Sequence, residues 1–174
     1  MERLVQSAQN GGNESFRELV KHFEPTIFSQ MTRFSKDRNV VETLTHDVFV
    51  EAYMSLHSFR FKSPFEHWLR KVAVRVGYKF WHNESKQRKH NEALQRVAAE
   101  ETTLPPQDRL AEFEELHLVL GQLPPRDRLV LTLIYWDNLS IEQAAKIAGW
   151  SKTMTKVQAH RARKKLAKLL EERE

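Results

Sequence analysis

Positively charged and hydrogen-bonding side chains recur at helical spacing over residues 152–170, near the C-terminal end of the sequence. Ammonium, guanidinium and imidazole groups can donate hydrogen bonds to phosphates and base edges, and a small apolar side chain can contact the methyl group of thymine. The side chains that share this face are Lys152, Lys156, Val157, His160, Arg161 and Lys164. The opposite face carries Thr155, Ala159, Ala162, Leu166 and Leu169. Because that second face suits a core, we expect a helix that lies in a major groove of DNA.

Two shorter helices are predicted directly before this one. Pro124-Pro125 offers a proline for a first helical position, and residues 126–136 can continue as a buried helix. The turn formers Asp137-Asn138 follow, and Ser140 with Gln143 then makes a capping-box pattern that opens a second helix.

The connection to the last helix has the residue types of a tight turn. Gly149 permits a left-handed backbone, Ala145 lets two helices approach closely, and Ser151 can cap the helix that follows. A lysine- and arginine-rich terminal helix is, by itself, more often a solvated face than a DNA-reading one. The turn, the caps and the small residue together favour a helix-turn-helix.

Composition indicates an all-α fold made of two small helical domains. The chain has 174 residues, five of them glycine, and its apolar residues recur mostly at three-to-four spacing, although residues 129–136 alone would also suit a strand. Cysteine is absent, which excludes a disulfide framework and a thiolate metal site. Without a signal peptide or a long apolar run, we expect a soluble protein of the cytoplasm.

The net charge of +5 conceals a strong segregation along the chain. Residues 60–96 hold ten Lys/Arg against three acids, which gives +7, and residues 152–174 hold eight against three, which gives +5. Between these blocks, residues 100–115 hold six acids against one arginine, which gives −5. Two basic surfaces with an acidic connector are typical of a protein that binds nucleic acid.

The N-terminal part predicts several amphipathic helices. We expect residues 1–14 to be frayed, and Pro25 to begin a new helical segment after the stripe that ends at Phe23. A longer stripe over residues 41–56, which includes Tyr53, is expected to face the core and to leave a partly acidic face exposed.

A loop at residues 57–64 interleaves aromatic rings with cations, and Pro64 then introduces a helix from Phe65. Rings and cations together suit single-stranded DNA, since base stacking contributes roughly 1–3 kcal/mol per base while cations hold phosphates. For Phe65 and Trp68 we favour core packing, whereas for Phe59 and Phe61 the two interpretations stay balanced.

The composition changes again between the two basic blocks. A charged helix that loses its apolar periodicity is predicted from residue 83, and the prolines at 105 and 106 end it. The predicted organisation is therefore a domain over residues 1–97, a flexible linker over 98–107 and a second domain over 108–174.

With both modules placed, the chain resembles the extracytoplasmic-function group of sigma-70-type RNA polymerase sigma factors. The N-terminal match runs from Val41 to Tyr53 and continues at Phe65-Glu66-His67-Trp68-Leu69. The C-terminal match includes Leu123-Pro124-Pro125-Arg126-Asp127-Arg128, Gly149-Trp150-Ser151 and His160-Arg161-Ala162-Arg163.

The resemblance implies three binding surfaces and their partners. Core polymerase would dock on Glu42, Thr43, His46, Asp47 and Glu51. The minus-ten element, melted to a single strand, would be captured by Phe59, Arg60, Phe61, Lys62, Trp68, Lys71, Arg75 and Lys79. The helix at 152–170 would read the minus-thirty-five element of the duplex through the six residues named at the outset. The group is commonly held inactive by an anti-sigma factor, which we expect as a further partner.

Some positions depart from the group's pattern. Thr43 and His46 stand where an acid and a glutamine are usual, and Arg75 and Lys79 replace residues that are commonly asparagine or acidic. Met154-Thr155 replaces the usual Thr-Val at the start of the recognition helix. These changes predict altered polymerase docking, altered base preference and a minus-thirty-five sequence of the chain's own.

Two other classes of protein fit parts of the sequence. An ordinary helix-turn-helix regulator would explain the C-terminal domain, but it would not need the aromatic and cationic block at residues 59–79. An enzyme or a metalloprotein is suggested only by the eight histidines, which show no metal-ligand spacing. We therefore expect no metal, no other cofactor and no catalytic site.

Overall fold

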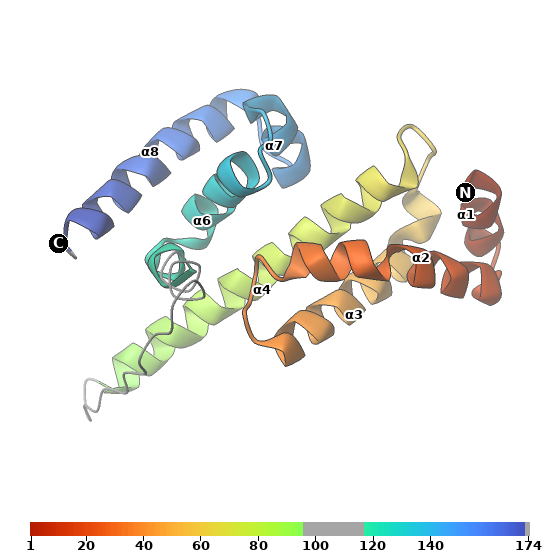
Figure 1. Cartoon of the computed structure of the whole chain (residues 1–174), viewed down its shortest axis with the longest axis horizontal. Coiled ribbons are helices and arrows are strands. Elements are labelled where there is room, and N and C mark those ends of the chain that lie inside the picture. Colours follow the sequence, from red (N-terminus) through yellow and green to blue (C-terminus); the bar gives the residue numbers. More distant parts are fainter. Residues whose placement is uncertain (96–116, 173–174) are drawn as a thin grey trace. The chain divides into compact units, whose positions relative to one another are not determined.

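A computed structural model describes residues 1–95 and 117–172, and in these residues the chain is helical apart from short connections (Figure 1). The predicted all-α fold is confirmed. The chain divides into two compact units, Met1–Phe80 and Trp81–Glu174. The proposed linker at 98–107 lies outside the described residues, so the domain limits drawn from the sequence stay predictions. No helix of the described residues is long and apolar enough to cross a membrane.

The first unit contains α1 (Glu2–Gln9), α2 (Asn13–Met31), α3 (Arg38–Ser55), a single 3-10 turn η1 (Leu56–Ser58) and the first part of α4 (Phe65–Gln95). The side chains that form its core come from every one of these elements. Those with almost no exposed surface include Val5, Leu19, Ile27, Val41, Val48, Leu69 and Val72.

Two expectations for this unit were wrong. Residues 2–9 form α1 instead of fraying, because Val5 and Ala8 are buried and α1 packs on α2. Helix α2 also continues through Pro25, where a new segment was expected. Pro25 is exposed, so the helix loses one hydrogen bond on a solvated side and no core packing.

In the second unit, residues 117–122 are helical and are followed by α6 (Pro125–Leu131), a π-helical turn η2 (Thr132–Trp136), α7 (Ile141–Ala148) and α8 (Lys152–Glu171). Pro125 occupies the start of α6, as predicted, and the strand alternative for residues 129–136 is wrong. The buried residues that form the core between these helices are Leu120, Leu123, Val130, Leu131, Ala159 and Ala162.

One glycine of the first unit is required by packing. An ideal Cβ on Gly77 of α4 would lie 2.4 Å from ring atoms of the buried Phe34. We expect Gly77→Ala to lower the free energy of unfolding by about 1–2 kcal/mol, because overpacking outweighs the better helix propensity of alanine. Urea denaturation measures this, with Lys79→Ala on the exposed face of the same helix as the control. Equal stability of Gly77→Ala and wild type would show that the ring has room to move.

Candidate nucleic-acid interface

The local geometry of the helix-turn-helix agrees with the sequence prediction. The Ser140 hydroxyl accepts a hydrogen bond from the Gln143 amide at 3.2 Å, and the Gln143 side chain accepts one from the Ser140 amide at 2.9 Å. Gly149 then adopts φ 73°, in the left-handed region. The Ser151 hydroxyl accepts from the Met154 amide at 3.1 Å and so caps α8. The capping box fixes where α7 begins, the turn at Gly149 where it ends, and the Ser151 cap where α8 begins.

Helix α8 divides into a buried and an exposed face. Thr155, Ala159 and Ala162 are buried, and Leu166 and Leu169 are half-buried against the same core. All six residues predicted to contact DNA are exposed: Lys152, Lys156, Val157, His160, Arg161 and Lys164. The structure therefore places them together on one accessible face, while their contacts with bases and phosphates stay a prediction.

One acid holds the buried side of α8 in register. The Asp127 carboxylate, only 1% exposed, accepts hydrogen bonds from Gln158 Nε2 at 2.5 Å and from Lys165 Nζ at 2.6 Å. Its partners are seven residues apart, about two helical turns, so they lie on one side of α8. A second link joins Arg163 Nη1 to the Tyr135 hydroxyl at 3.0 Å. Sequence reasoning noted Asp127 only as part of a motif and gave it no partner.

Not every cation of the exposed face is equally available. Glu142 of α7 pairs with Lys146 at 3.0 Å and with Lys152 at 3.7 Å. The hydrogen bond and charge of Lys146, and then the charge of Lys152, lower the pKa of Glu142. Because exposed ion pairs contribute little, a phosphate can replace Glu142 as the partner of Lys152 at small cost.

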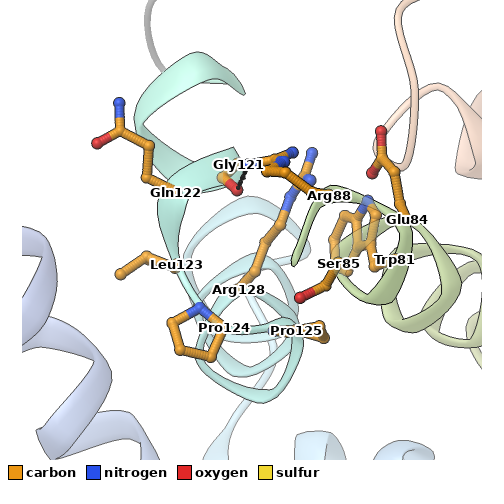
Figure 2. Close-up of a pocket in the computed structure, with 10 residues that line it drawn as sticks. All are labelled: Trp81, Glu84, Ser85, Arg88, Gly121, Gln122, Leu123, Pro124, Pro125 and Arg128. Carbon is orange, nitrogen blue, oxygen red and sulfur yellow. Dashed lines mark hydrogen bonds between the residues drawn. The ribbon is translucent and has the colours of Figure 1, made fainter. Parts of the chain in front are cut away.

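Arg128, an arginine of the second unit, is buried (Figure 2). The Arg128 guanidinium lies 4.0 Å from the centre of the Trp81 ring, and the two side chains are only 8% and 2% exposed. They line a hollow of about 320 Å³, at whose edge Arg88 Nη1 donates to the Gly121 carbonyl at 3.0 Å. Burial lowers the pKa of Arg128 to about 10; nearby Glu84 raises it and Arg88 lowers it further. The sequence analysis did not identify this stack.

In the first unit, the aromatic loop is anchored by a cluster of rings. Phe59 packs against Phe65 and Trp68, with 5.5 Å between ring centres in each pair, and Phe65 lies 5.5 Å from Phe23. Phe59 and Phe65 are buried, whereas Trp68 is half-buried. Of the two interpretations of Phe59, core packing and contact with single-stranded DNA, the structure therefore favours core packing.

Phe61 has the opposite environment from Phe59. Its ring is 41% exposed, lies 4.9 Å from the Phe59 ring and is carried on a backbone with φ 55°. Arg60 and Lys62 on either side of it are exposed, and so are Arg75 and Lys79 of α4, while Lys71 is half-buried. Beside the loop is a hollow of about 510 Å³ lined by residues of the loop, α1 and α2. The structure brings one accessible ring, its flanking cations Arg60 and Lys62 and a cavity together, whereas Arg75 and Lys79 lie further along α4.

Helix α3 carries the five residues predicted to contact polymerase. Glu42, Thr43, His46, Asp47 and Glu51 are all exposed. Apolar side chains stand among them, which sequence reasoning missed: Val50, Tyr53 and Met54 are 43%, 51% and 68% exposed.

Tyr53 corrects the expectation that the whole stripe of residues 41–56 faces the core. Its ring packs edge-on against Phe16 at 4.9 Å, and its hydroxyl pairs with Asn13 Oδ1 at 3.1 Å. A hollow of about 460 Å³ between α2 and α3 adjoins this surface. An exposed apolar strip among acids is typical of a protein-binding site.

The capped turn and the exposed face of α8 define a helix-turn-helix protein, and residues 113–166 match the family model described as sigma-70, region 4. The chain is 28% identical to the RNA polymerase sigma factor YlaC of Bacillus subtilis, over 89% of this chain and 91% of that relative. It is 26% identical to the RNA polymerase sigma-H factor of Pseudomonas aeruginosa, over 98% and 93% of the two chains.

Solved structures agree in fold. The sigma factor RpoE in complex with the anti-sigma factor NepR, from Bartonella quintana, is similar with a TM-score of 0.58 and 23% identity, over 91% of this chain and 98% of that one. The chain of CnrH in complex with the cytosolic domain of CnrY gives a TM-score of 0.61 at 23% identity, over 97% and 95%. The family model and these relatives support an extracytoplasmic-function sigma factor of the sigma-70 family. The resemblance drawn from the sequence is thereby confirmed.

The buried carboxylate of Asp127 gives a test of how α8 is held. Asp127→Asn removes the charge and presents an amide to Lys165, so we expect the free energy of unfolding to fall by about 1–3 kcal/mol. Glu142→Gln, at an exposed acid that also pairs with two lysines, is the control and should change it by less than about 0.5 kcal/mol. Equal effects of the two changes in urea denaturation would contradict a special role of Asp127.

The buried guanidinium predicts an unusual dependence on pH. The pKa of Arg128 is about 10 in the folded protein, below that of an ordinary arginine, so burial of its charge destabilises the fold below pH 10. That cost diminishes as pH rises above about 10, because the folded state then releases the proton first. We expect Arg128→Met to be at least as stable as wild type at neutral pH, since a buried charge can often be replaced by an apolar side chain without loss.

The advantage of Arg128→Met over wild type should shrink between about pH 9 and pH 11, as measured by urea denaturation at several pH values. Arg126→Met removes an exposed arginine near the Trp150 ring and is the matched control. A stability difference between Arg128→Met and wild type that stays constant with pH would show that Arg128 keeps its proton in the folded state throughout this range.

Proposed function

We propose that this sigma factor binds core RNA polymerase, directs it to a set of promoters and assists the opening of the duplex. The observation that carries the proposal is that one chain presents two different exposed cationic surfaces. The exposed face of α8 suits duplex DNA, and the loop around Phe61 suits a single strand. A regulator that only binds duplex DNA has no use for the second surface. The chain would act in the cytoplasm, and the chemistry of RNA synthesis would belong to the polymerase.

For the minus-thirty-five element, we assign the reading of bases and phosphates to the exposed face of α8. Arg161 and His160 offer donors for base edges, and Val157 offers an apolar contact for a thymine methyl. Lys152, Lys156 and Lys164 would hold phosphates and orient the helix. The capped start of α8 supports this role, since a fixed helix places its side chains in the groove without further ordering.

For the minus-ten element, we assign base capture to Phe61 and the cations around it. The exposed Phe61 ring provides a stacking surface, and the adjacent hollow of about 510 Å³ falls in the range of pockets that enclose small ligands, roughly 300–1,000 Å³. Arg60, Lys62, Arg75 and Lys79 would hold the phosphates of the melted strand. Phe59 would act beneath them as support. Lys71 and Trp68, both half-buried, would contribute at the edge of this surface.

Core polymerase would dock on α3. The acids Asp47 and Glu51 suit a basic partner and would speed association, whereas Val50 and Met54 would supply most of the buried apolar contact. An anti-sigma factor that covers this strip would block polymerase binding by direct competition. The relatives with solved structures include a sigma factor held by an anti-sigma factor, which supports a partner of this kind.

Transcription from a pool of genomic promoter fragments tests the function. Bacterial core polymerase is supplied with or without the protein under the same conditions, and start sites are mapped. Discrete new start sites that need the protein would establish initiation and would give its promoter sequence. Duplex binding without initiation would instead identify a regulator that lacks the initiation role.

The promoter found in this way allows a single-residue test of the α8 assignment. Arg161→Ala should weaken binding to the minus-thirty-five duplex by about 1–3 kcal/mol, roughly 5- to 150-fold, because a bidentate base contact is lost. Lys168→Ala, exposed but near the end of the same helix, is the control. Fluorescence anisotropy measures both affinities. Full promoter-dependent transcription by Arg161→Ala would remove Arg161 from the recognition surface.

A further inference from the structure

The first helix of the chain is tied to the aromatic loop by one side chain. Gln9, the last residue of α1, donates from Nε2 to the Leu56 carbonyl at 2.9 Å and to the Phe59 carbonyl at 2.8 Å. These two carbonyls mark the beginning of the turn η1 and the residue that follows it. One amide group therefore bridges both ends of the segment from which the loop departs, across 47 and 50 residues of sequence.

The carbonyl groups of Leu56 and Phe59 lie where they need a hydrogen-bond donor. Leu56 and Phe59 are both buried, and the Leu56 carbonyl also accepts the Phe59 amide at 3.0 Å within the turn. Carbonyl groups close to a core are destabilising unless they are hydrogen-bonded. A three-residue 3-10 turn is too short to be stable by itself, so its geometry depends on outside partners.

Helix α1 is itself held firmly enough to act as a support. Val5 is fully buried and Ala8 nearly so, which fixes the helix against α2. The Ser7 hydroxyl lies 2.7 Å from the Ser15 hydroxyl of α2 and adds a polar link. The position of the Gln9 amide is therefore set by the packing of α1, since the buried Val5 lies one turn away on the same face of the helix.

The conformation of the loop sets where the Phe61 ring lies relative to the Phe59 ring. The Phe59 ring is fixed in the aromatic cluster, and the backbone turns through φ 55° only two residues later, which leaves the Phe61 ring exposed and 4.9 Å from the Phe59 ring. A left-handed φ at a bulky residue is strained and persists only where the surroundings impose it. The bond from Gln9 to the Phe59 carbonyl lies at the base of this turn.

We propose that Gln9 is a positioning residue for promoter opening, which holds the loop in the shape that presents Phe61 to an unpaired base. The role rests on the proposed function as a sigma factor and extends it to a residue outside the three surfaces assigned above. Gln9 does not contact the base. With the Gln9 hydrogen bonds in place, the loop is already ordered before the single strand binds. A preorganised site binds more tightly, because the conformational entropy of the loop is not lost on binding.

The test uses the full chain with core polymerase and the promoter identified by start-site mapping. Gln9→Met keeps the length and helix propensity of the side chain but has no donor, whereas Gln9→Lys restores an N–H donor at similar reach. Gln6→Met, at an exposed glutamine of the same helix, is the matched control. Binding to a single-stranded minus-ten oligonucleotide and open-complex formation, followed by a fluorescent base analogue, are measured for each variant.

We expect Gln9→Met to lose about tenfold in single-strand affinity and in the rate of opening, with duplex binding at the minus-thirty-five element unchanged. A loss of tenfold corresponds to about 1.4 kcal/mol. Gln9→Lys should recover most of it, and Gln6→Met should resemble wild type.

A double-mutant cycle separates positioning from a general loss of stability. If Gln9 acts through Phe61, Gln9→Met combined with Phe61→Ala is no weaker than Phe61→Ala alone, whereas independent defects would add. Additive defects, or wild-type behaviour of Gln9→Met, overturn the proposal. Should Gln9→Met fold poorly, Gln9→Ala is used in the same cycle, and hydrogen exchange that rises across residues 56–63 but not in α2 or α3 is the expected sign of a released loop.

The failure of the proposed function gives a different pattern. In that case the wild-type protein itself supports no initiation, and the role of Gln9 in opening fails with it. Initiation by wild type with no defect in the Gln9 variants overturns only the positioning role.

Discussion

The structure depends on helices that must bury a narrow stripe on one side while they keep the other side free for binding. Helices α6 and α7 have seven and eight residues, which is shorter than an isolated helix needs to be stable in water, about 12–15 residues. Their stability therefore comes from the shared core against α8. That core uses alanine at positions 159 and 162 of α8, so the helices can approach closely and the recognition helix still exposes its cations.

The alanines that α8 contributes to this core bury little apolar area, and polar contacts add to what holds the helix in place. The carboxylate of Asp127 in α6 accepts hydrogen bonds from Gln158 and Lys165 of α8, and the Tyr135 hydroxyl accepts one from Arg163. Such charge-assisted bonds are directional where apolar contacts are not. Rotation of α8 about its own axis would break them, so they define which residues face solvent. The orientation of the face proposed to bind DNA is thus a consequence of the contacts on the buried side of α8.

In the first unit, too, buried residues support a side chain that stays exposed. Phe59 and Phe65 are buried among rings, while Phe61 is left exposed at the end of a strained backbone turn. Gln9 secures the start of that turn from a helix far away in sequence. On α3, the exposed apolar residues Val50 and Met54 stand among acids, so apolar area and negative charge share one surface.

The sequence by itself determined what depends on short-range interactions and on helical periodicity. The Ser140 and Ser151 caps, the turn at Gly149 and the exposed face of α8 follow from bonds within a few residues and from the 3.6-residue repeat, and the motifs in that order already indicated the family. Tertiary structure alone decided the partners of Asp127, the stack of Arg128 on Trp81, the burial of Phe59 and the anchoring of α1 through Gln9. The contacts of Asp127, Arg128 and Gln9 join residues about 30 to 50 positions apart. At that separation no local pattern specifies which side chains meet; only the packing of one helix against another does.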